Sequence, residues 1–596
     1  MQGLEKLTYK RTGYCAAFNA NDIGREITVC GWVQRRRALG GLIFVDLRDR
    51  TGIIQLNFDE SASSDLFKRA YSLRSEDCIC AIGTVQSRGE SAVNTDMATG
   101  EIEIAVKDLQ ILSKSETPPF EIVENSTVNE ELRLKYRYLD LRRPDVQQPI
   151  LLRSKLASIA REYFLKNDFI EIETPNLCRS TPEGARDYLV PSRVHAGKFY
   201  ALPQSPQLYK QLLMVAGFDR YMQIARCYRD EDLRADRQPE FTQIDLEMSF
   251  VDVDDVIEVN EGFVRKAFQE MLHIDIAMPL PRMTYAEAMS RYGSDKPDTR
   301  FGYELQDISE TVKDCGFQVF RQAIATGGSV RAIVIEESAD KFPRREIDSL
   351  TEFVKTYRAK GLAWLKCGEQ ITSSFAKFLS EEELQRLCTV LCVKPGDTVF
   401  IVADNNKIVF DSLGALRCHI AKKLNVIPSD KYSLLWVTEF PLLEYDEEQG
   451  RYVAMHHPFT SPMFEDIDLL DSAPEKVRAK AYDLVINGME AGGGSIRIYN
   501  STLQEKMFQT LGFTIDEAQK QFGYLMTAFK YGVPPHGGMA YGFDRLSMIF
   551  AGRDSIRDVI AFPKVQNASE LMTNCPDFVD EQQLHDLHIE VTEKEK

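Results

Sequence analysis

The chain has 596 residues, a length that suits roughly three to five domains. Its apolar content of 44% and charged content of 27% are typical of a globular protein that folds in water. With 72 basic and 90 acidic residues the net charge is −18, which excludes a generally basic nucleic-acid coat but leaves room for a local basic surface. The start of the chain lacks a signal peptide's apolar core, no apolar run is long enough to span a membrane, and the 12 cysteines show no zinc-site spacing. We therefore expect a cytoplasmic protein with reduced thiols and no membrane partner.

Residues 1–115 contain short apolar stretches separated by glycine-rich turns, which predict a small five-stranded barrel of the OB type. The predicted strands are 27–33, 42–47, 52–56, 78–85 and 101–106. Three arginines at 35–37 lie beside Trp32 and Phe44. Basic and aromatic side chains together favour single-stranded RNA, because bases stack on rings and phosphates bind cations. A solvated turn beside core aromatics explains the same pattern equally well.

A linker is predicted at 116–143, and its basic end fits a hinge that touches RNA and a plain connector equally well. Apolar residues then recur at helical spacing over 151–167, and 169–175 predicts a strand that ends at a proline.

Two strands of alternating polarity flank a charged loop at 229–238. The alternation places Gln243, Asp245 and Glu247 on one face and apolar residues on the other. The loop is much longer than a hairpin needs, and such loops are usually functional. A solvated, salt-bridged hairpin is the alternative.

A tight hairpin is predicted at 481–491, since Asn487-Gly488 favours a type I′ turn. Val485 then faces Glu490, so Asp483 is a diagonal neighbour of Glu490 on the same face, roughly 7 Å away. Two such carboxylates can share a hard cation that carries nucleotide phosphates, although a solvated surface pair is equally compatible. The glycines at 492–494 invite a bulge, so the face of Arg497 cannot be counted.

Near the end of the chain, a glycine-rich strand ends at Gly542 and a helix begins near Phe543. Arg545 then lies in the first turn, beside a helix N-terminus that favours phosphate. Between these two halves, residues 303–417 have their own strands and helices and no cluster of candidate catalytic residues. They predict an inserted α/β module.

Together these features resemble the class II aminoacyl-tRNA synthetases. Arg229-Asp230-Glu231 with Phe241 resembles motif 2 of that class, 151–175 resembles motif 1, and 537–546 resembles motif 3. The barrel sequence GWVQRRR, the turn GSDKPD at 293–298 and the large insertion are similar to the bacterial aspartyl-tRNA synthetase family over nearly the whole length. A synthetase for asparagine or lysine and a non-catalytic RNA-binding relative are the alternatives.

The resemblance implies a fold and a domain order. The fold class is α+β and multidomain, with an N-terminal OB-fold barrel, a six- to seven-stranded antiparallel sheet flanked by helices, and the inserted α/β domain. The implied domains are the anticodon-binding barrel at 1–115, a hinge at 116–143, a catalytic core split into 144–300 and 419–565, a GAD-type insertion at 301–418 and a C-terminal extension at 566–596.

The implied reaction activates L-aspartate with ATP to aspartyl-adenylate and pyrophosphate, then transfers aspartate to the 3′ end of tRNA(Asp). Whether tRNA(Asn) is also charged stays open. The resemblance also implies that the protein is a homodimer and that the reaction needs Mg²⁺.

The resemblance also assigns residues to sites. The catalytic residues are Arg229, Glu231 and Arg545. The ATP-binding residues are Arg229, Asp230, Glu231, Gln238, Phe241, Glu490, Gly542, Phe543, Asp544 and Arg545. The aspartate-binding residues are Glu183, Ser205, Gln207, Leu208, Tyr209, Lys210, Arg229, Gln243, Asp245, His456 and Arg497. The metal ligands are Asp483 and Glu490, the anticodon contacts are Arg37, Phe44, Gln55 and Glu103, and the tRNA-discriminating positions are Leu39 and Ser91. Leucine at 39 resembles the discriminating form of the family, whose relaxed form often has histidine there.

Overall fold

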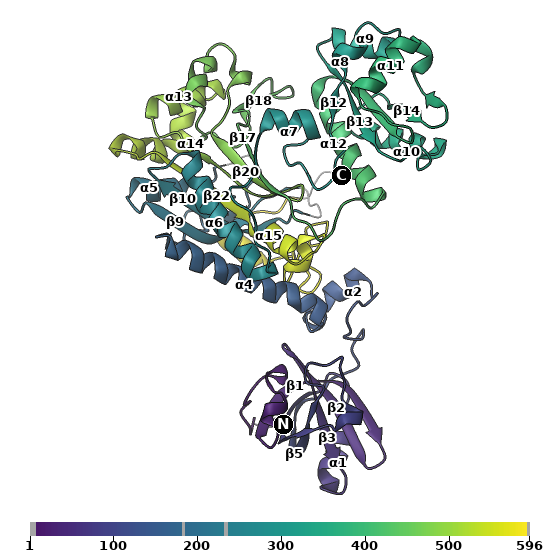
Figure 1. Cartoon of the computed structure of the whole chain (residues 1–596). Helices are drawn as coiled ribbons and strands as arrows, with labels where there is room; N and C mark the ends of the chain where they lie inside the picture. Colours follow the sequence, from purple (N-terminus) through teal and green to yellow (C-terminus); the bar gives the residue numbers. More distant parts are fainter. Residues whose placement is uncertain (1–6, 182–184, 232–235, 593–596) are drawn as a thin grey trace. The chain divides into compact units, whose positions relative to one another are not determined.

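A computed structural model describes residues 7–181, 185–231 and 236–592 (Figure 1). The chain forms two compact units. One comprises the residues up to Arg153 together with Arg557–Phe578, and the other comprises Ser154–Ile556 and the residues from Val579 onward. Within the described part of the chain, no helix combines the length and the apolar character needed to cross a membrane.

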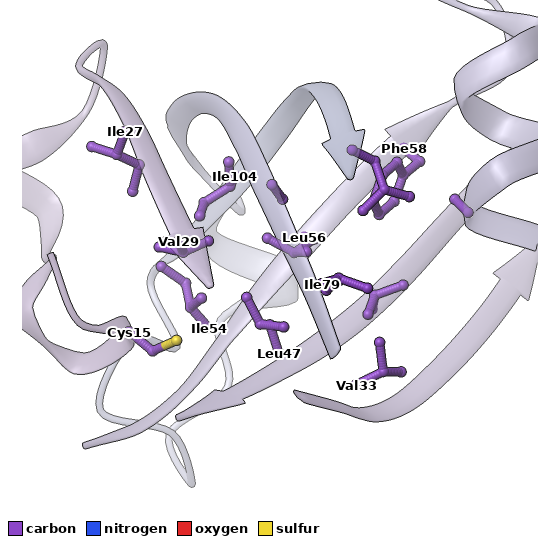
Figure 2. Close-up of a cluster of buried hydrophobic side chains, with 14 of the residues drawn as sticks. Cys15, Ile27, Val29, Val33, Leu47, Ile54, Leu56, Phe58, Ile79 and Ile104 are labelled. Atoms are coloured by element: carbon purple, nitrogen blue, oxygen red, sulfur yellow. The ribbon is translucent and has the colours of Figure 1, made fainter. Parts of the chain in front are cut away.

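The first unit contains a closed five-stranded barrel. Its strands are β1 (Glu26–Leu39), β2 (Leu42–Asp49), β3 (Gly52–Asp59), β4 (Cys78–Ser87) and β5 (Ile102–Ser113), in the order β1-β2-β3-β5-β4, with helix α1 (Ser64–Tyr71) after β3. Alternate residues of each strand fill the interior, as Figure 2 shows for Val29, Leu56 and Ile79. Strand β1 is longer than predicted, because it stays paired with β2 as far as Leu39, opposite Leu42.

The hinge folds into two short helices, α2 (Glu130–Lys135) and α3 (Arg137–Asp140). Asp140 is fully buried and accepts hydrogen bonds from Arg133, Arg137 and Arg143. These arginines therefore form a structural ion cluster, which accounts for much of the basic composition that the sequence shows here.

The second unit is built on an eight-stranded sheet. Its six central strands are antiparallel: β17 (Leu434–Thr438), β20 (Ala481–Ile486), β21 (Met489–Ile496), β22 (His536–Gly542), β10 (Glu240–Ser249) and β9 (Arg220–Tyr228). The short strands β11 (Arg282–Thr284) and β6 (Ile170–Glu171) add parallel pairs at the two edges. The sheet is therefore wider than the resemblance implied, and the strand predicted at 169–175 is reduced to two paired residues.

Three helices pack against the apolar face of this sheet. They are α4 (Pro144–Lys166), α6 (Val253–Leu272) and α15 (Phe543–Phe550). Phe263 of α6 lies between Phe164 and Tyr541, with ring centroids 5.0 and 5.2 Å away. The opposite face carries the alternating polar residues of β10, and the candidate active site lies on that face. Outside the insertion, the described part of this unit also has α5 (Gln207–Val215), α7 (Tyr285–Tyr292), α13 (Ser501–Thr510), α14 (Ile515–Ala528), α16 (Glu581–Asp586), β7 (Leu189–Pro191) with β8 (Phe199–Ala201), and β18 (Leu443–Asp446) with β19 (Arg451–Ala454).

The insertion has its own five-stranded antiparallel sheet, in the order β12 (Gln306–Asp307), β13 (Ser329–Ile335), β16 (Thr398–Asp404), β14 (Ala363–Cys367) and β15 (Ile371–Ser373). Two apolar clusters form against it. One includes residues of α10 (Arg344–Lys355) and α12 (Asn406–Lys423), and the other includes residues of α8 (Ser309–Val312), α9 (Gln318–Ala325) and α11 (Glu381–Val390). Both faces of its sheet are therefore covered, as expected of an α/β module.

Candidate active site

The site is organised by the register between β10 and its two neighbours. Gln243 lies opposite Ala225 of β9 and Gly542 of β22, and Asp245 and Glu247 follow on the same face. The carboxylates are almost fully buried, with 1% and 0% of their residues exposed. Buried carboxylates need partners, so this face must carry a polar network.

A cavity of about 220 Å³ lies where the loop after β9 meets β10, β21 and β22. Its lining includes Arg229, Glu231, Asp236, Arg237, Gln238, Phe241, Gln243, Glu490, Ala540, Gly542, Asp544, Arg545 and Ile556. Most of the predicted ATP-binding residues therefore surround this one cavity, which is called the nucleotide cavity below after that prediction. Asp230 and Phe543 are outside this lining, since Asp230 faces Arg186 at 3.4 Å and Phe543 is buried in the core.

Two arginines dominate this cavity. The guanidinium of Arg229 lies 5.1 Å from the ring centroid of Phe241. Arg545 donates to the carbonyl of Glu490 at 2.6 Å and to Asp236 at 3.3 Å, which fixes its guanidinium beside the cavity. Cations next to an aromatic ring suit a nucleotide, because phosphates pair with the cations and a base stacks on the ring.

Asp544 holds the first turn of α15 in place. Its carboxylate accepts a 2.8 Å hydrogen bond from the backbone N–H of Thr242 in β10. This contact joins the two motifs that carry Arg229 and Arg545, so Asp544 positions the cavity walls.

Beyond the cavity, buried ion pairs form a second site around Glu247. Lys210 of α5 lies 2.7 Å from Asp245 and 3.2 Å from Glu247. Arg497 makes a bidentate pair with Glu247, at 2.9 and 3.1 Å. Although burial opposes ionisation, Arg497 and Lys210 lower the pKa of Glu247 to about 2, so this carboxylate stays charged. One buried carboxylate thus holds two cations in a fixed arrangement.

Two histidines border this charged site. His457 lies 2.6 Å from Arg497, measured between the ring Nε2 and Nη1. Burial and Arg497 lower the pKa of His457 well below its usual range, so the neutral ring accepts from Arg497 through Nε2. His456, the predicted residue, packs edge-on against Phe440 with centroids 4.9 Å apart, and burial lowers its pKa as well. His457 is therefore the histidine in direct contact with the ion pairs, and the sequence offered no way to choose between adjacent rings.

The other predicted aspartate contacts separate into two groups. Gln207 is buried on α5, one turn before Lys210, and Gln243 reaches the nucleotide cavity. Ser205, Leu208 and Tyr209 instead line a separate cavity of about 210 Å³. Glu183 lies outside the described residues.

The predicted metal pair lies on the hairpin β20–β21. Positive φ angles of 52° at Asn487 and 78° at Gly488 match the type I′ turn, and Val485 faces Glu490 as counted. A bulge then shifts the register, so Asp483 faces Gly493. A Cβ at 493 would lie 2.2 Å from Oδ1 of Asp483, so glycine leaves the space that this carboxylate occupies. Burial, Glu490 and Asp295 raise the pKa of Asp483 well above its usual range.

The predicted anticodon contacts lie on the outside of β1, β2, β3 and β5, and three of them are joined by hydrogen bonds. Arg37 donates to Asp46 at 2.8 Å and to the amide oxygen of Gln55 at 3.1 Å. The amide nitrogen of Gln55 donates to Glu103 at 2.7 Å, so both ends of this amide are oriented. Phe44 is opposite Arg37 in the register and half-buried.

The two predicted discriminating positions are exposed. Leu39 is 66% exposed at the end of β1, and Ser91 lies in a single 3₁₀ turn at Glu90–Ala92.

Comparison with known protein families gives two matches along the chain. Residues 129–566 match the family described as tRNA synthetases class II (D, K and N). Residues 27–112 match the family described as OB-fold nucleic acid binding domain. The second match covers most of the barrel, and the first covers all the residues of the nucleotide cavity.

Curated relatives are similar over nearly the whole length. The chain is 61% identical to a protein named aspartate–tRNA ligase from Ruminiclostridium cellulolyticum, over 98% of this chain and 99% of the relative. It is 59% identical to a protein named aspartate–tRNA(Asp/Asn) ligase from Lachnoclostridium phytofermentans, over 98% of both chains.

Solved structures share the fold at much lower identity. Asparaginyl-tRNA synthetase from Pyrococcus horikoshii, complexed with asparaginyl-adenylate, has a TM-score of 0.58 and 18% identity, over 93% of this chain and 98% of that one. The corresponding enzyme from Entamoeba histolytica has a TM-score of 0.56 and 19% identity, over 92% and 97%. Likeness at these identities shows the fold alone.

Proposed function

Because the chain belongs to the class II tRNA synthetases of the D, K and N type, we propose that it joins aspartate to tRNA(Asp) at the expense of ATP. The observation that carries the choice of amino acid is the pair of buried cations, Lys210 and Arg497, held together by Glu247 beside the nucleotide cavity. A desolvated cation pair of this kind is a receptor for a carboxylate side chain.

The charges of the site favour aspartate over its neighbours in size. Lys210 and Arg497 are both paired with Glu247, while burial raises the pKa of the other carboxyl, Asp245. Free aspartate carries two carboxylates, and we assign its side-chain carboxylate to Lys210 and Arg497 and its α-carboxylate to Arg229. Asparagine has no side-chain carboxylate and would give up a charge-assisted contact with Lys210 and Arg497, which typically costs about 1.5–3 kcal/mol.

In the first step, the α-carboxylate of aspartate attacks the α-phosphate of ATP and pyrophosphate leaves. Arg229 binds the carboxylate and the phosphate together, which orients the reactants and neutralises the charge that develops. Phe241 and Arg545 hold the adenine between them, while Glu231 and Gln238 contact the nucleotide. In the second step, the terminal ribose hydroxyl of the tRNA takes the aspartyl group.

Asp483 and Glu490 suit a magnesium ion that accompanies ATP. Among the described residues, no three His, Cys, Asp or Glu side chains form a complete metal cage, and Mg²⁺ needs only one or two carboxylates when phosphates supply the rest. Burial and the nearby Glu490 disfavour the charged form of Asp483, so a bound cation would stabilise the two carboxylates in their charged forms. When bound, the ion orients the phosphates and offsets their charge.

The barrel would recognise the anticodon. Phe44 provides a ring for stacking, and the Arg37–Gln55–Glu103 network provides oriented donors and acceptors for base edges.

We also propose a cytoplasmic homodimer. Large apolar side chains are exposed along the segment that runs from the edge strand β6 to β8, including Ile170, Leu177, Leu189, Val194 and Phe199. An exposed strand edge with an apolar surround is a surface that proteins usually cover. Sedimentation that returns only the monomer mass at micromolar concentration would refute the dimer.

The decisive test of the activity is ATP–pyrophosphate exchange with each of the twenty amino acids. We expect aspartate alone to support rapid exchange, and expect the same protein to charge tRNA(Asp). Exchange driven by asparagine or lysine instead would assign the chain to another member of the family, and exchange with none would leave an RNA-binding relative.

A further inference from the structure

Two cysteines of the barrel face each other across a strand pair, far in sequence from the residues that line the nucleotide cavity. Cys30 of β1 and Cys80 of β4 are direct partners in the antiparallel register, and their Sγ atoms lie 3.1 Å apart. Both cysteines are reduced. Val29 and Ile79, their neighbours in sequence, point into the barrel in Figure 2, so the two thiols project from its outer face.

The backbone separation suits a covalent link. Directly opposed residues of antiparallel strands have Cα atoms about 4.5–5.5 Å apart, within the range found for disulfides. The sulfur atoms need to approach by only about 1 Å to reach bonding distance. Side-chain rotation supplies such a movement without changing the strand register.

The two thiols differ in access and in acidity. Cys30 is half-buried and Cys80 is fully buried. A hydrogen bond from Cys80 and the nearby Arg11 guanidinium, acting against burial, lower the pKa of Cys30 to about 7, while the same pairing raises the pKa of Cys80. Cys30 is therefore the accessible thiolate and Cys80 the protonated partner behind it.

The N-terminal segment holds Arg11 in this position. Thr12 donates its backbone N–H to the carbonyl of Thr28 at 3.0 Å, and Arg11 donates to the carbonyl of Cys30 at 2.6 Å. The segment thus lies beside β1 and adds a positive charge next to the thiolate.

We propose that Cys30 and Cys80 form a modification site, a dithiol that hydrogen peroxide converts reversibly into a cross-strand disulfide. The inference does not rest on the proposed synthetase activity, because it uses only the barrel.

The chemistry balances with one peroxide per pair. The Cys30 thiolate attacks one oxygen of hydrogen peroxide, the O–O bond breaks, and the departing hydroxide takes a proton to become water. The sulfur of Cys80 then attacks the resulting sulfenic acid of Cys30, the S–O bond breaks, and a second water leaves with the thiol proton. Two thiols are oxidised and one peroxide is reduced to two waters.

Cys78 provides a matched control. It lies on β4 two residues from Cys80, is half-buried like Cys30, and faces Trp32 in the register rather than a thiol. Burial raises the pKa of Cys78, so this thiol stays protonated. If pairing of two thiols determines which cysteine reacts, peroxide should leave Cys78 unoxidised. If exposure alone determines it, Cys78 should be oxidised as readily as Cys30.

The test treats the reduced full-length protein with increasing hydrogen peroxide, blocks the remaining thiols with N-ethylmaleimide, and maps peptides by mass spectrometry without reduction. We expect a linked pair of peptides that contain Cys30 and Cys80, formed before the exposed Cys392, Cys418 and Cys575 are oxidised and abolished by dithiothreitol. Cys30→Ser and Cys80→Ser should each prevent the link, and Cys78→Ser should leave it intact. A Cys30–Cys78 link, or oxidation that reaches the exposed cysteines first, would overturn the proposal.

A second measurement does not depend on the folding of those variants. In the wild-type protein, alkylation of Cys30 by iodoacetamide should be half-maximal near pH 7, well below the midpoint for Cys78. In Cys80→Ala the hydrogen bond is lost, so the midpoint for Cys30 should rise. Equal midpoints for Cys30 and Cys78 in the wild type would count against the paired thiolate.

Discussion

Glu247 shows how one side chain sets the chemistry of its neighbours. It contacts both Lys210 and Arg497. A Cβ at Gly538 would lie 2.0 Å from the Glu247 carboxylate, so only glycine at 538 leaves room for this side chain. The polar face of this strand was predictable from period-two alternation, but the role of Glu247 was not. A carboxylate in an alternating strand gives no sign of whether it meets water or two buried cations.

We expect Lys210→Met to weaken aspartate far more than ATP. Loss of a charge-assisted contact costs about 1.5–3 kcal/mol, or roughly tenfold to a hundredfold in the KM for aspartate. Pyrophosphate exchange at varied aspartate and varied ATP measures both constants. Lys506→Met, which removes a surface pair with Asp471, is the control and should change neither. Equal losses for the two substrates would argue against a side-chain role for Lys210.

Arg229→Ala should abolish adenylate formation while the protein stays folded. A cation that neutralises transition-state charge contributes on the order of 3 kcal/mol, so exchange should fall at least a hundredfold. Arg226→Ala is the matched control, because Arg226 lies on β9 three residues before Arg229 and pairs with Glu240. Near-normal exchange in Arg229→Ala would show that the active site has been misplaced.

Elements show a similar division between what the pattern predicts and what packing adds. The barrel strands and the motif 3 strand–helix junction follow from alternation and glycine placement. The glycines at 492–494 also indicated a bulge, but the register that it produces could not be counted, because a run of three glycines offers no side chains from which to count. For the same reason the face of Arg497 became clear only from its contacts with Glu247. Helix α4 begins at Pro144, earlier than periodicity suggested, since proline is tolerated in a first turn.

Close packing between strands predicts a large effect at Gly538. In Gly538→Ala the new methyl group would lie 2.1 Å from the carbonyl oxygen of Leu246, which the β10–β22 pairing holds in place. Overpacking of this kind costs about 1–3 kcal/mol or more, so the melting temperature should fall by several degrees. Gly302→Ala meets nothing within 4 Å and should melt like the wild type. If both variants melt alike, the tight approach of β22 to β10 is not a constraint.

At the scale of the whole molecule, the sequence predicts an order of barrel, core, insertion and resumed core, because each part has its own pattern. Helices cover both faces of the sheet in the insertion. Among the described residues, none that lines the nucleotide cavity belongs to the insertion. The sequence therefore located this module without indicating its purpose.

The next prediction concerns the tip of β1 and the choice between tRNAs. Leu39 is exposed there, and leucine resembles the discriminating form of the family. We expect the protein to charge an asparagine tRNA transcript much more slowly than an aspartate one, and expect Leu39→His to narrow the ratio. Comparable rates in the wild type would place the chain with relatives such as the aspartate–tRNA(Asp/Asn) ligase.

The last prediction concerns the proposed separation between tRNA binding by the barrel and adenylate formation in the core. If the barrel recognises the anticodon as proposed, a base stacked on Phe44 would contribute about 1–3 kcal/mol and the oriented Gln55 amide would contact a base edge. Phe44→Ala and Gln55→Ala should therefore lower kcat/KM for tRNA roughly tenfold to a hundredfold. Pyrophosphate exchange without tRNA should not change, because every described residue that lines the nucleotide cavity belongs to the other compact unit. Tyr71→Ala removes an exposed ring from α1 of the same barrel and should alter neither assay. Loss of exchange in both barrel variants would show that the barrel contributes to the chemistry itself.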